Sequence, residues 1–206
     1  LIKEAFSERL LAYWSSILSL LALGLITCLV GIREAGLGAI GLEWISLGRL
    51  MSWGFGLTVV GVTVSFLFRS IEVSLQLQES KIVRALLPKT LEEKGVFALL
   101  SAAAGFGEEV AYRGYAIPVL APITGAPGAV LVTSFIFGLM HSYQGTLGII
   151  RTMTIGGLLA LGFLISGSLL PCILAHTLIN IIVGIAIPQH LMPIESPLSA
   201  EDFGEP

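Results

Sequence analysis

Charged residues are scarce in this chain. Only 12% of its 206 residues are Asp, Glu, Lys or Arg, whereas 55% are hydrophobic. Because a soluble domain carries about 25% charged residues, this composition excludes an ordinary soluble domain and indicates an integral membrane protein. The few basic residues form no patch, so we expect no nucleic-acid partner.

Cysteine and the common short motifs are also nearly absent. The only two cysteines, Cys28 and Cys172, lie inside apolar segments without metal-ligand spacing, which excludes a disulfide framework. There is no H-E-x-x-H, and no basic P-loop accompanies the glycines of "AAAGFG" and "IGGLLALG". We interpret those glycines as points where helices approach closely.

Long apolar segments are what the sequence has instead. A membrane-spanning helix needs about 20 mostly apolar residues, and six segments qualify, the fourth being the shortest. They lie at 10–32, 50–69, 95–116, 127–142, 146–166 and 168–187. We therefore predict an all-α polytopic transmembrane helix bundle of about six spans. The first segment lacks a small-residue cleavage site and is read as a retained anchor rather than a signal peptide.

One long polar stretch, 70–94, divides the chain. It predicts a cytoplasmic connector, partly amphipathic, between 1–94 with two spans and a core of four spans at 95–187. The acidic tail at 188–206 is rich in turn formers and is predicted to be disordered. Eight of the 11 Lys and Arg residues fall on the side of the N-terminus, so we predict a multi-pass protein of the cell membrane with both termini cytoplasmic.

A helix start is marked at the end of the connector. Thr90 and Glu93 have the T-x-x-E spacing of a capping box, and Pro88 precedes them. We predict a helix from Thr90 to Ile117, about 42 Å long at 1.5 Å per residue. The prolines and glycines at 118–128 then predict a turn before the next span.

Ionisable side chains inside the apolar segments are the functional signal. An ionisable group in a span costs at least about 2.5–3.5 kcal/mol, so such groups usually face the bundle interior and mark function. They concentrate in the second half of the chain: Glu108, Glu109, Arg113, His141 and His176, with Asn180.

Helical spacing sorts these groups. Glu109 and Arg113 stand at i and i+4 and can pair, whereas Glu108 is rotated by about 100°. His176 and Asn180 also share one face. Each piece has a structural alternative: a buried ion cluster that fixes helix packing, a polar clasp between helices, or an interfacial histidine at 141.

The ordered set of pieces carries a resemblance. E-E-x-x-x-R at 108–113, F-x-x-x-H at 137–141 and H-x-x-x-N at 176–180 lie on three different predicted spans. Over about 95–187 the chain resembles the CPBP family of intramembrane proteases, which includes type II CAAX prenyl endopeptidases and bacteriocin-processing or immunity proteins.

The resemblance implies a glutamate-dependent membrane endopeptidase and a role for each residue. Glu108 would be the general base that activates water and His141 its partner. His176 and Asn180 would form the oxyanion hole. Glu109 and Arg113 would be a supporting ion pair, with Phe137 as a packing neighbour. Amide hydrolysis independently requires a base for water and donors for the oxyanion.

The resemblance also implies partners, and it leaves alternatives. The substrate would be a peptide or a lipidated, CAAX-like protein in the bilayer, and no cofactor is expected. Two histidines and two glutamates could instead hold zinc. A non-enzymatic immunity or partner-binding protein of the same fold stays open, as does a proton-coupled transporter. The transporter is weakened because the sequence shows no inverted repeat.

Overall fold

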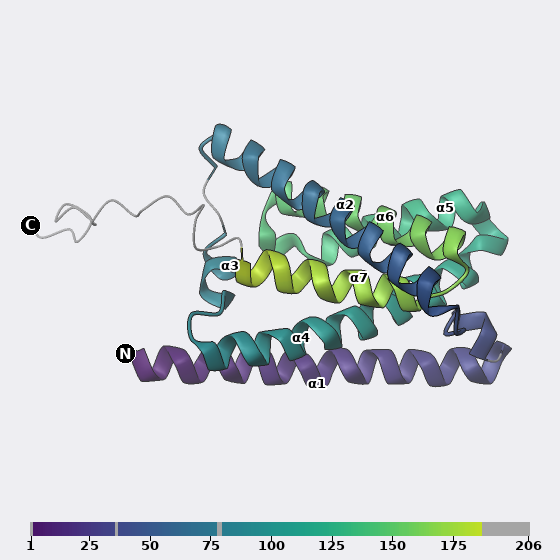
Figure 1. The fold of residues 1–206 in the computed structure, drawn as a ribbon, viewed down its shortest axis with the longest axis horizontal. Coiled ribbons are helices and arrows are strands. Elements are labelled where there is room, and N and C mark those ends of the chain that lie inside the picture. The colour runs from purple at the N-terminus through teal and green to yellow at the C-terminus, as the bar shows by residue number, and fades with distance from the viewer. Residues whose placement is uncertain (1, 36, 78–79, 187–206) are drawn as a thin grey trace, which may run out of the picture.

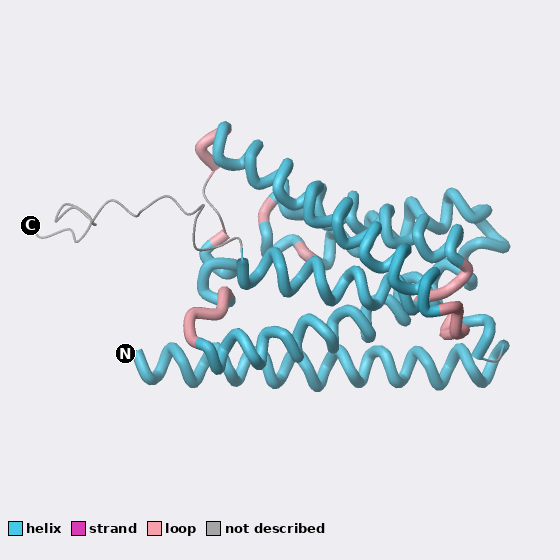
Figure 2. The backbone as a smooth tube through the Cα atoms, viewed as in Figure 1, coloured by secondary structure: helices cyan, strands magenta, loops and turns pink. Residues whose placement is uncertain are grey.

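A computed structural model describes residues 2–35, 37–77 and 80–186, and within these ranges the chain is helical and contains no strand. Figure 2 shows that short loops join the helices. The elements in order are α1 (Ile2–Ala35), η1 (Leu37–Ile40), α2 (Leu47–Ser74), α3 (Lys81–Leu86), α4 (Leu91–Glu109), η2 (Val110–Ala116), α5 (Ile117–Met140), η3 (Ser142–Gln144), α6 (Thr146–Ser166), α7 (Leu170–Ile181) and η4 (Ile182–Ala186). The predicted all-α bundle is confirmed.

Within the described residues, four helical stretches are long and apolar enough to cross a membrane. They are Glu8–Arg33, Leu47–Ser74, Leu91–Met140 and Thr146–Ser166. The third has 50 residues, about 75 Å at 1.5 Å per residue, which is far longer than a hydrocarbon core of about 30 Å. It folds back on itself and holds two of the six predicted spans, α4 and α5 running in opposite directions (Figure 1). The last predicted span is the shorter apolar helix Leu170–Ile185.

The fold-back lies at Gly125, within the turn predicted at 118–128, but the helix before it ends later than predicted. We expected the helix to stop at Ile117, but it continues through Pro118 and reaches Gly125, where φ is 73° and ψ is 161°. That conformation is open almost only to glycine, which fixes the turn there. The stretch before Pro118, Val110–Ala116, is a π-helix. Its wider turn relieves the clash that a proline ring makes with the preceding turn of an α-helix, so Pro118 does not end the helix.

Helix α7 lies at the centre of the bundle. It contacts α2, α4 and α6, and α1 packs along α4 on the outer side (Figure 1). Glycines allow these close approaches: a Cβ added at Gly105 would meet the Ile173 carbonyl of α7 at 2.9 Å, and one at Gly107 would collide with the Leu20 backbone of α1. The core between them includes fully buried Val110, Leu159 and Cys172.

The start of α4 is fixed by polar groups. Thr90 accepts a hydrogen bond from the Glu93 N–H, and the Glu93 carboxylate accepts one from the Thr90 N–H, so the predicted capping box is present. Glu93 also pairs with Arg9 of α1 at 2.7 Å. Tyr13 donates to the carbonyl of Leu86, the last residue of α3, which ties α1 to the end of that helix. We call Arg9, Tyr13 and Glu93, with the backbone groups they bind, the clamp.

Several sequence predictions remain predictions. The predicted connector begins inside α2, which extends to Ser74, and it includes the short α3. Its cytoplasmic placement, the orientation of both termini and the division at residues 94 and 187 rest on the sequence alone. The tail predicted to be disordered, 188–206, lies outside the described residues.

Candidate active site

The predicted ion pair of Glu109 and Arg113 lies buried at the centre of the bundle. Arg113 Nη1 donates to Glu109 Oε1 at 2.7 Å, and the two side chains are 1% and 0% exposed. Arg113 Nη2 reaches α6 and donates to the Gly156 carbonyl at 3.0 Å. The guanidinium lies 4.5 Å from the centre of the Phe137 ring. One arginine therefore links η2 to α4, α5 and α6.

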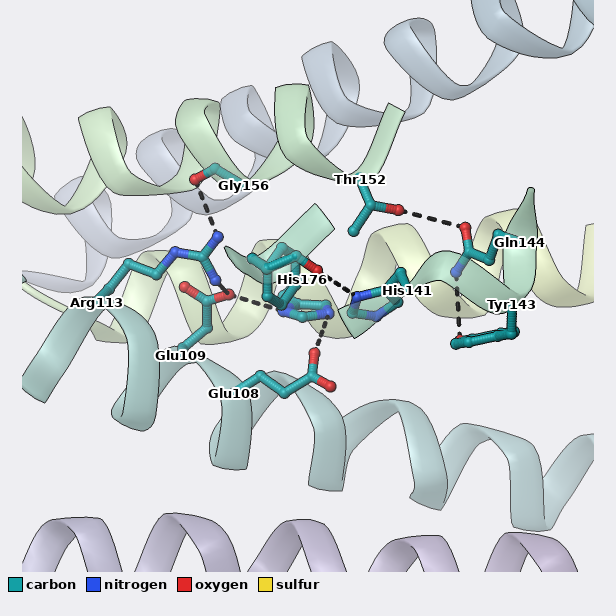
Figure 3. A network of polar contacts seen from close by, with 10 residues as sticks. Glu108, Glu109, Arg113, His141, Tyr143, Gln144, Thr152, Gly156 and His176 are labelled. Carbon is teal, nitrogen blue, oxygen red and sulfur yellow. Dashed lines mark hydrogen bonds and ion pairs between the residues drawn. The ribbon is translucent and has the colours of Figure 1, made fainter. Parts of the chain in front are cut away.

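His176 of α7 binds the same glutamate oxygen. Its Nδ1 lies 2.8 Å from Glu109 Oε1 (Figure 3). Because an ionised carboxylate only accepts hydrogen bonds, the proton lies on Nδ1. The other ring nitrogen, Nε2, then points toward Glu108, 3.6 Å from its Oε2. Glu109 thus orients His176 so that its Nε2 faces Glu108, a contact that the sequence reading did not include.

Glu108 differs from its neighbour in making no hydrogen bond with the described residues. Its side chain is 17% exposed, but Oε2 is buried and makes no hydrogen bond with any described residue. The 3.6 Å separation from His176 Nε2 is too long for a hydrogen bond. It does suit a water at about 2.8 Å from both atoms, at the apex of a triangle.

His141 completes the site at the end of α5. Its Nδ1 lies 2.8 Å from the Phe137 carbonyl, which can only accept, so Nδ1 carries the proton and Nε2 of the neutral ring is an acceptor. The buried Phe137 ring lies 4.8 Å from the His141 ring and 6.0 Å from the His176 ring, so it contacts both imidazoles. Figure 3 shows the two imidazoles gathered beside the Glu108 carboxylate. We call Glu108, Glu109, Arg113, His141 and His176 the central network.

Asn180 is the one candidate that the structure does not join to the others. It lies one turn beyond His176 on α7, half-buried, before the π-helical Ile182–Ala186. It makes no hydrogen bond with any residue in the described ranges. Side chains one turn apart on a helix are about 5–6 Å apart at Cβ, so Asn180 is a neighbour of His176 without being bonded to it.

Polar neighbours that the sequence reading missed lie beside His141. The Tyr143 ring is 5.8 Å from the His141 ring, and Gln144 Nε2 donates to the Tyr143 hydroxyl at 3.3 Å (Figure 3). Gln144 Oε1 in turn accepts from Arg151 at 2.8 Å and from Thr152 at 3.3 Å. Tyr143 and Gln144 lie two and three residues after His141, and this closeness in the sequence is the one feature that could have pointed to them.

Among the described residues, no group of three or more His, Cys, Asp or Glu is arranged to hold a metal ion. One carboxylate of the central network, Glu109, is occupied by Arg113 and His176.

Comparison with known proteins identifies one stretch. Residues 90–182 match the family described as "Type II CAAX prenyl endopeptidase Rce1-like". This stretch contains every residue of the central network, together with Phe137 and Asn180. No curated protein and no solved structure matches the chain.

Proposed function

We propose, from the membership of residues 90–182 in the Rce1-like family of type II CAAX prenyl endopeptidases, that this chain is an intramembrane endopeptidase in which Glu108 activates water. Its substrate would be a membrane-associated peptide or protein with a CAAX-like, prenylated end. Several long apolar helices make the chain an integral membrane protein, which suits a substrate held at the bilayer by a lipid.

The position of Glu108 carries this proposal. A buried carboxylate oxygen without a protein partner is costly to keep, about 1–3 kcal/mol or more for a charged group. Here Glu108 Oε2 faces a histidine nitrogen at 3.6 Å, and a second histidine lies nearby (Figure 3). A water bound there would have a carboxylate to accept its proton. Its second hydrogen would be directed to the neutral Nε2 of His141.

Whereas Glu108 and His141 would accept hydrogens from the water, charge balance favours His176 as a hydrogen-bond donor. Glu108 and Glu109 carry two negative charges and Arg113 one positive charge, so an imidazolium at His176 makes the four side chains neutral. An imidazolium donates from Nε2, the atom that faces the reaction space. It would stabilise the negative oxygen of the tetrahedral intermediate, with the Asn180 amide as a second donor after a rotation of its side chain.

The steps balance without a cofactor. The water oxygen attacks the peptide carbonyl carbon, and its proton passes to Glu108. The carbonyl oxygen becomes the oxyanion held by His176 and Asn180. The C–N bond then breaks, and Glu108 returns the proton to the leaving amine. Glu109 and Arg113 would act by holding His176 and the surrounding helices in place.

The test compares purified wild-type protein with Glu108→Gln in detergent, with release of product from a farnesylated CAAX peptide as the readout. The change keeps size and hydrogen bonding but removes the base, so the rate should fall by about 10²–10⁴-fold while folding is retained. Glu92→Gln is the matched control, since Glu92 lies exposed on the same helix, away from the site, and should leave the rate unchanged. No product from the wild-type protein would favour the partner-binding alternative.

A chelator separates this mechanism from zinc hydrolysis. If Glu108 and His141 hold the water directly, activity should survive prolonged treatment with a chelator, and purified protein should carry no stoichiometric zinc. A zinc enzyme would lose its activity and regain it when metal is added. Reversible loss of activity would contradict the proposed mechanism while leaving the endopeptidase assignment intact.

A further inference from the structure

Arg151 holds a positive charge near the site without a carboxylate partner. Arg9, Arg69 and Arg113 each form an ion pair with a glutamate. Arg151 instead donates from Nη2 to the neutral amide of Gln144 at 2.8 Å, and no acidic side chain among the described residues pairs with it. It lies half-buried in the second turn of α6, near the positive end of the helix dipole, where a cation is slightly unfavourable.

A short series of contacts leads from this arginine to the proposed catalytic histidine. Gln144 joins Arg151 to Tyr143 through its amide oxygen and nitrogen. The Tyr143 ring contacts the His141 ring, with 5.8 Å between their centres. Only two side chains therefore separate the guanidinium from His141, and Figure 3 shows Tyr143 and Gln144 on the side of His141 away from Arg113.

The proposed substrate supplies an anion close to its scissile bond. A C-a-a-X motif ends the protein that carries it, so its free carboxylate lies at most three residues from any bond within the motif. Three extended residues span about 10 Å. A peptide with its scissile bond at Glu108 and His141 thus has its terminal carboxylate a few side chains away.

We propose that Arg151, held in place by Gln144, binds the C-terminal carboxylate of the peptide substrate and selects chain ends over internal segments. This inference rests on the proposed function. A guanidinium has five N–H donors in a planar fork, and the bond to Gln144 uses one of them. The remaining donors can bind a carboxylate through two parallel hydrogen bonds, and the neutral amide of Gln144 leaves the full positive charge for that anion.

The experiment measures hydrolysis of two otherwise identical farnesylated CAAX peptides, one ending in a free carboxylate and one in an amide. The full chain is reconstituted in phosphatidylcholine vesicles. The wild-type protein should cleave the acid with a kcat/KM about 10–100-fold above that of the amide, the range of a charge-assisted hydrogen bond, mainly through KM. Arg151→Gln should lower the acid to the level of the amide and leave the amide unchanged, and Arg151→Lys should keep part of the preference.

The ratio of the two substrates separates binding from structure. If Arg151 served only to hold Gln144, its replacement would lower both peptides equally, and that result would overturn the proposal. Arg49→Gln is the matched control: Arg49 also donates to an uncharged oxygen, the Ser166 carbonyl at the other end of α6, and its loss should preserve the ratio.

Other outcomes also decide the question. Equal cleavage of acid and amide by the wild-type protein would overturn the role of Arg151 while leaving the endopeptidase standing, whereas cleavage of neither would remove the proposed function and this inference together. A third result is that Arg151→Gln matters only when phosphatidylglycerol is added to the vesicles, with both peptides affected equally. That result would assign Arg151 to lipid phosphate and overturn the proposal.

Discussion

Two buried glutamates on one continuous helix, Glu93 and Glu109, have very different surroundings. Each is 0% exposed and lies 2.7 Å from an arginine nitrogen. In the clamp, both oxygens of Glu93 are used: Oε1 accepts from Arg9, and Oε2 accepts from the N–H groups of Lys89 and Thr90 at 2.6 and 2.9 Å. In the central network, Oε1 of Glu109 accepts from both Arg113 and His176, while Oε2 accepts nothing from the described residues.

This difference in hydrogen bonding distinguishes the clamp, which stabilises the fold, from the central network, which we propose carries the chemistry. Buried polar atoms without a partner cost about 1–3 kcal/mol each unless water or a ligand reaches them. Among the described side chains, such atoms occur only in or beside the central network: Glu108 Oε2, Glu109 Oε2, Arg113 Nε and Ser134 Oγ. The clamp has none. A fold that needed only to hold its helices together could satisfy both places equally well.

Loss of the Glu109 charge should have the largest effect. Glu109→Gln leaves Arg113 buried without a carboxylate and gives His176 a neutral amide oxygen in place of a charged one. Breaking a buried pair costs about 3–5 kcal/mol, and hydrolysis per folded molecule should fall as well because a neutral amide oxygen holds the Nδ1–H of His176 less firmly than a carboxylate does. Unfolding in mixed detergent measures the first effect, and peptide hydrolysis by the folded fraction measures the second.

A double mutant tests whether the pair is the cause. Glu109→Gln with Arg113→Gln removes both charges and should recover part of the lost stability, which gives a coupling energy between the two sites. Activity should stay low, since His176 still lacks the carboxylate that orients it. If Glu109→Gln is stable and inactive while Glu108→Gln stays active, the roles of the two glutamates are exchanged.

The contacts that the sequence could predict are those between residues close together on one helix. The Glu109–Arg113 pair and the Thr90 capping box each follow from three or four residues on one helix, where geometry fixes which groups meet. The bond from His176 to Glu109 joins positions 67 residues apart and depends on how α4 sits against α7. Gly105 allows that close approach, since a Cβ there would lie 2.9 Å from the Ile173 carbonyl, and a linear sequence does not reveal which residue of α7 it meets.

The position of the fold-back shows the same limit. Five prolines and glycines between 118 and 128 all predicted a turn, and the sequence could not rank them. Of these five residues, only Gly125 adopts a positive φ. The π-helix before Pro118 lets the helix continue past that proline, so the chain does not turn there. The roles of Tyr143, Gln144 and Arg151 were missed for a similar reason, since none of them belongs to a recognisable motif.

A smaller effect is expected at the clamp. Glu93→Gln replaces one carboxylate oxygen by an NH₂ group, which cannot accept the hydrogen bonds of Arg9 or of the Lys89 and Thr90 backbone. Arg9 is 11% exposed and keeps the Ala85 carbonyl, so its charge is less isolated than that of Arg113. Stability should fall by about 1.5–3 kcal/mol, while kcat per folded molecule stays at the wild-type value. A drop in kcat equal to that of Glu109→Gln would remove the distinction between the two regions.

The smallest effect concerns the glycine that gives Arg113 room. A Cβ added at Gly156 would lie 3.1 Å from Arg113 Nη2 and 3.1 Å from Phe137 Cδ1, whereas one at Gly157 would meet Ser134 Oγ at an ordinary 3.7 Å. Alanine in a helix gains up to about 1 kcal/mol over glycine at either position, so the two variants share that gain and differ in crowding. Gly156→Ala should be about 1–2 kcal/mol less stable than Gly157→Ala, since overpacking costs about 1–3 kcal/mol. It should also slow hydrolysis, because displaced Arg113 and Phe137 no longer hold Glu109 and the two histidines in register, whereas Gly157→Ala should keep the wild-type rate. Equal stability and equal rates for the two variants, measured side by side in the same detergent, would mean that the central network tolerates a displacement of Arg113 and Phe137 without loss of function.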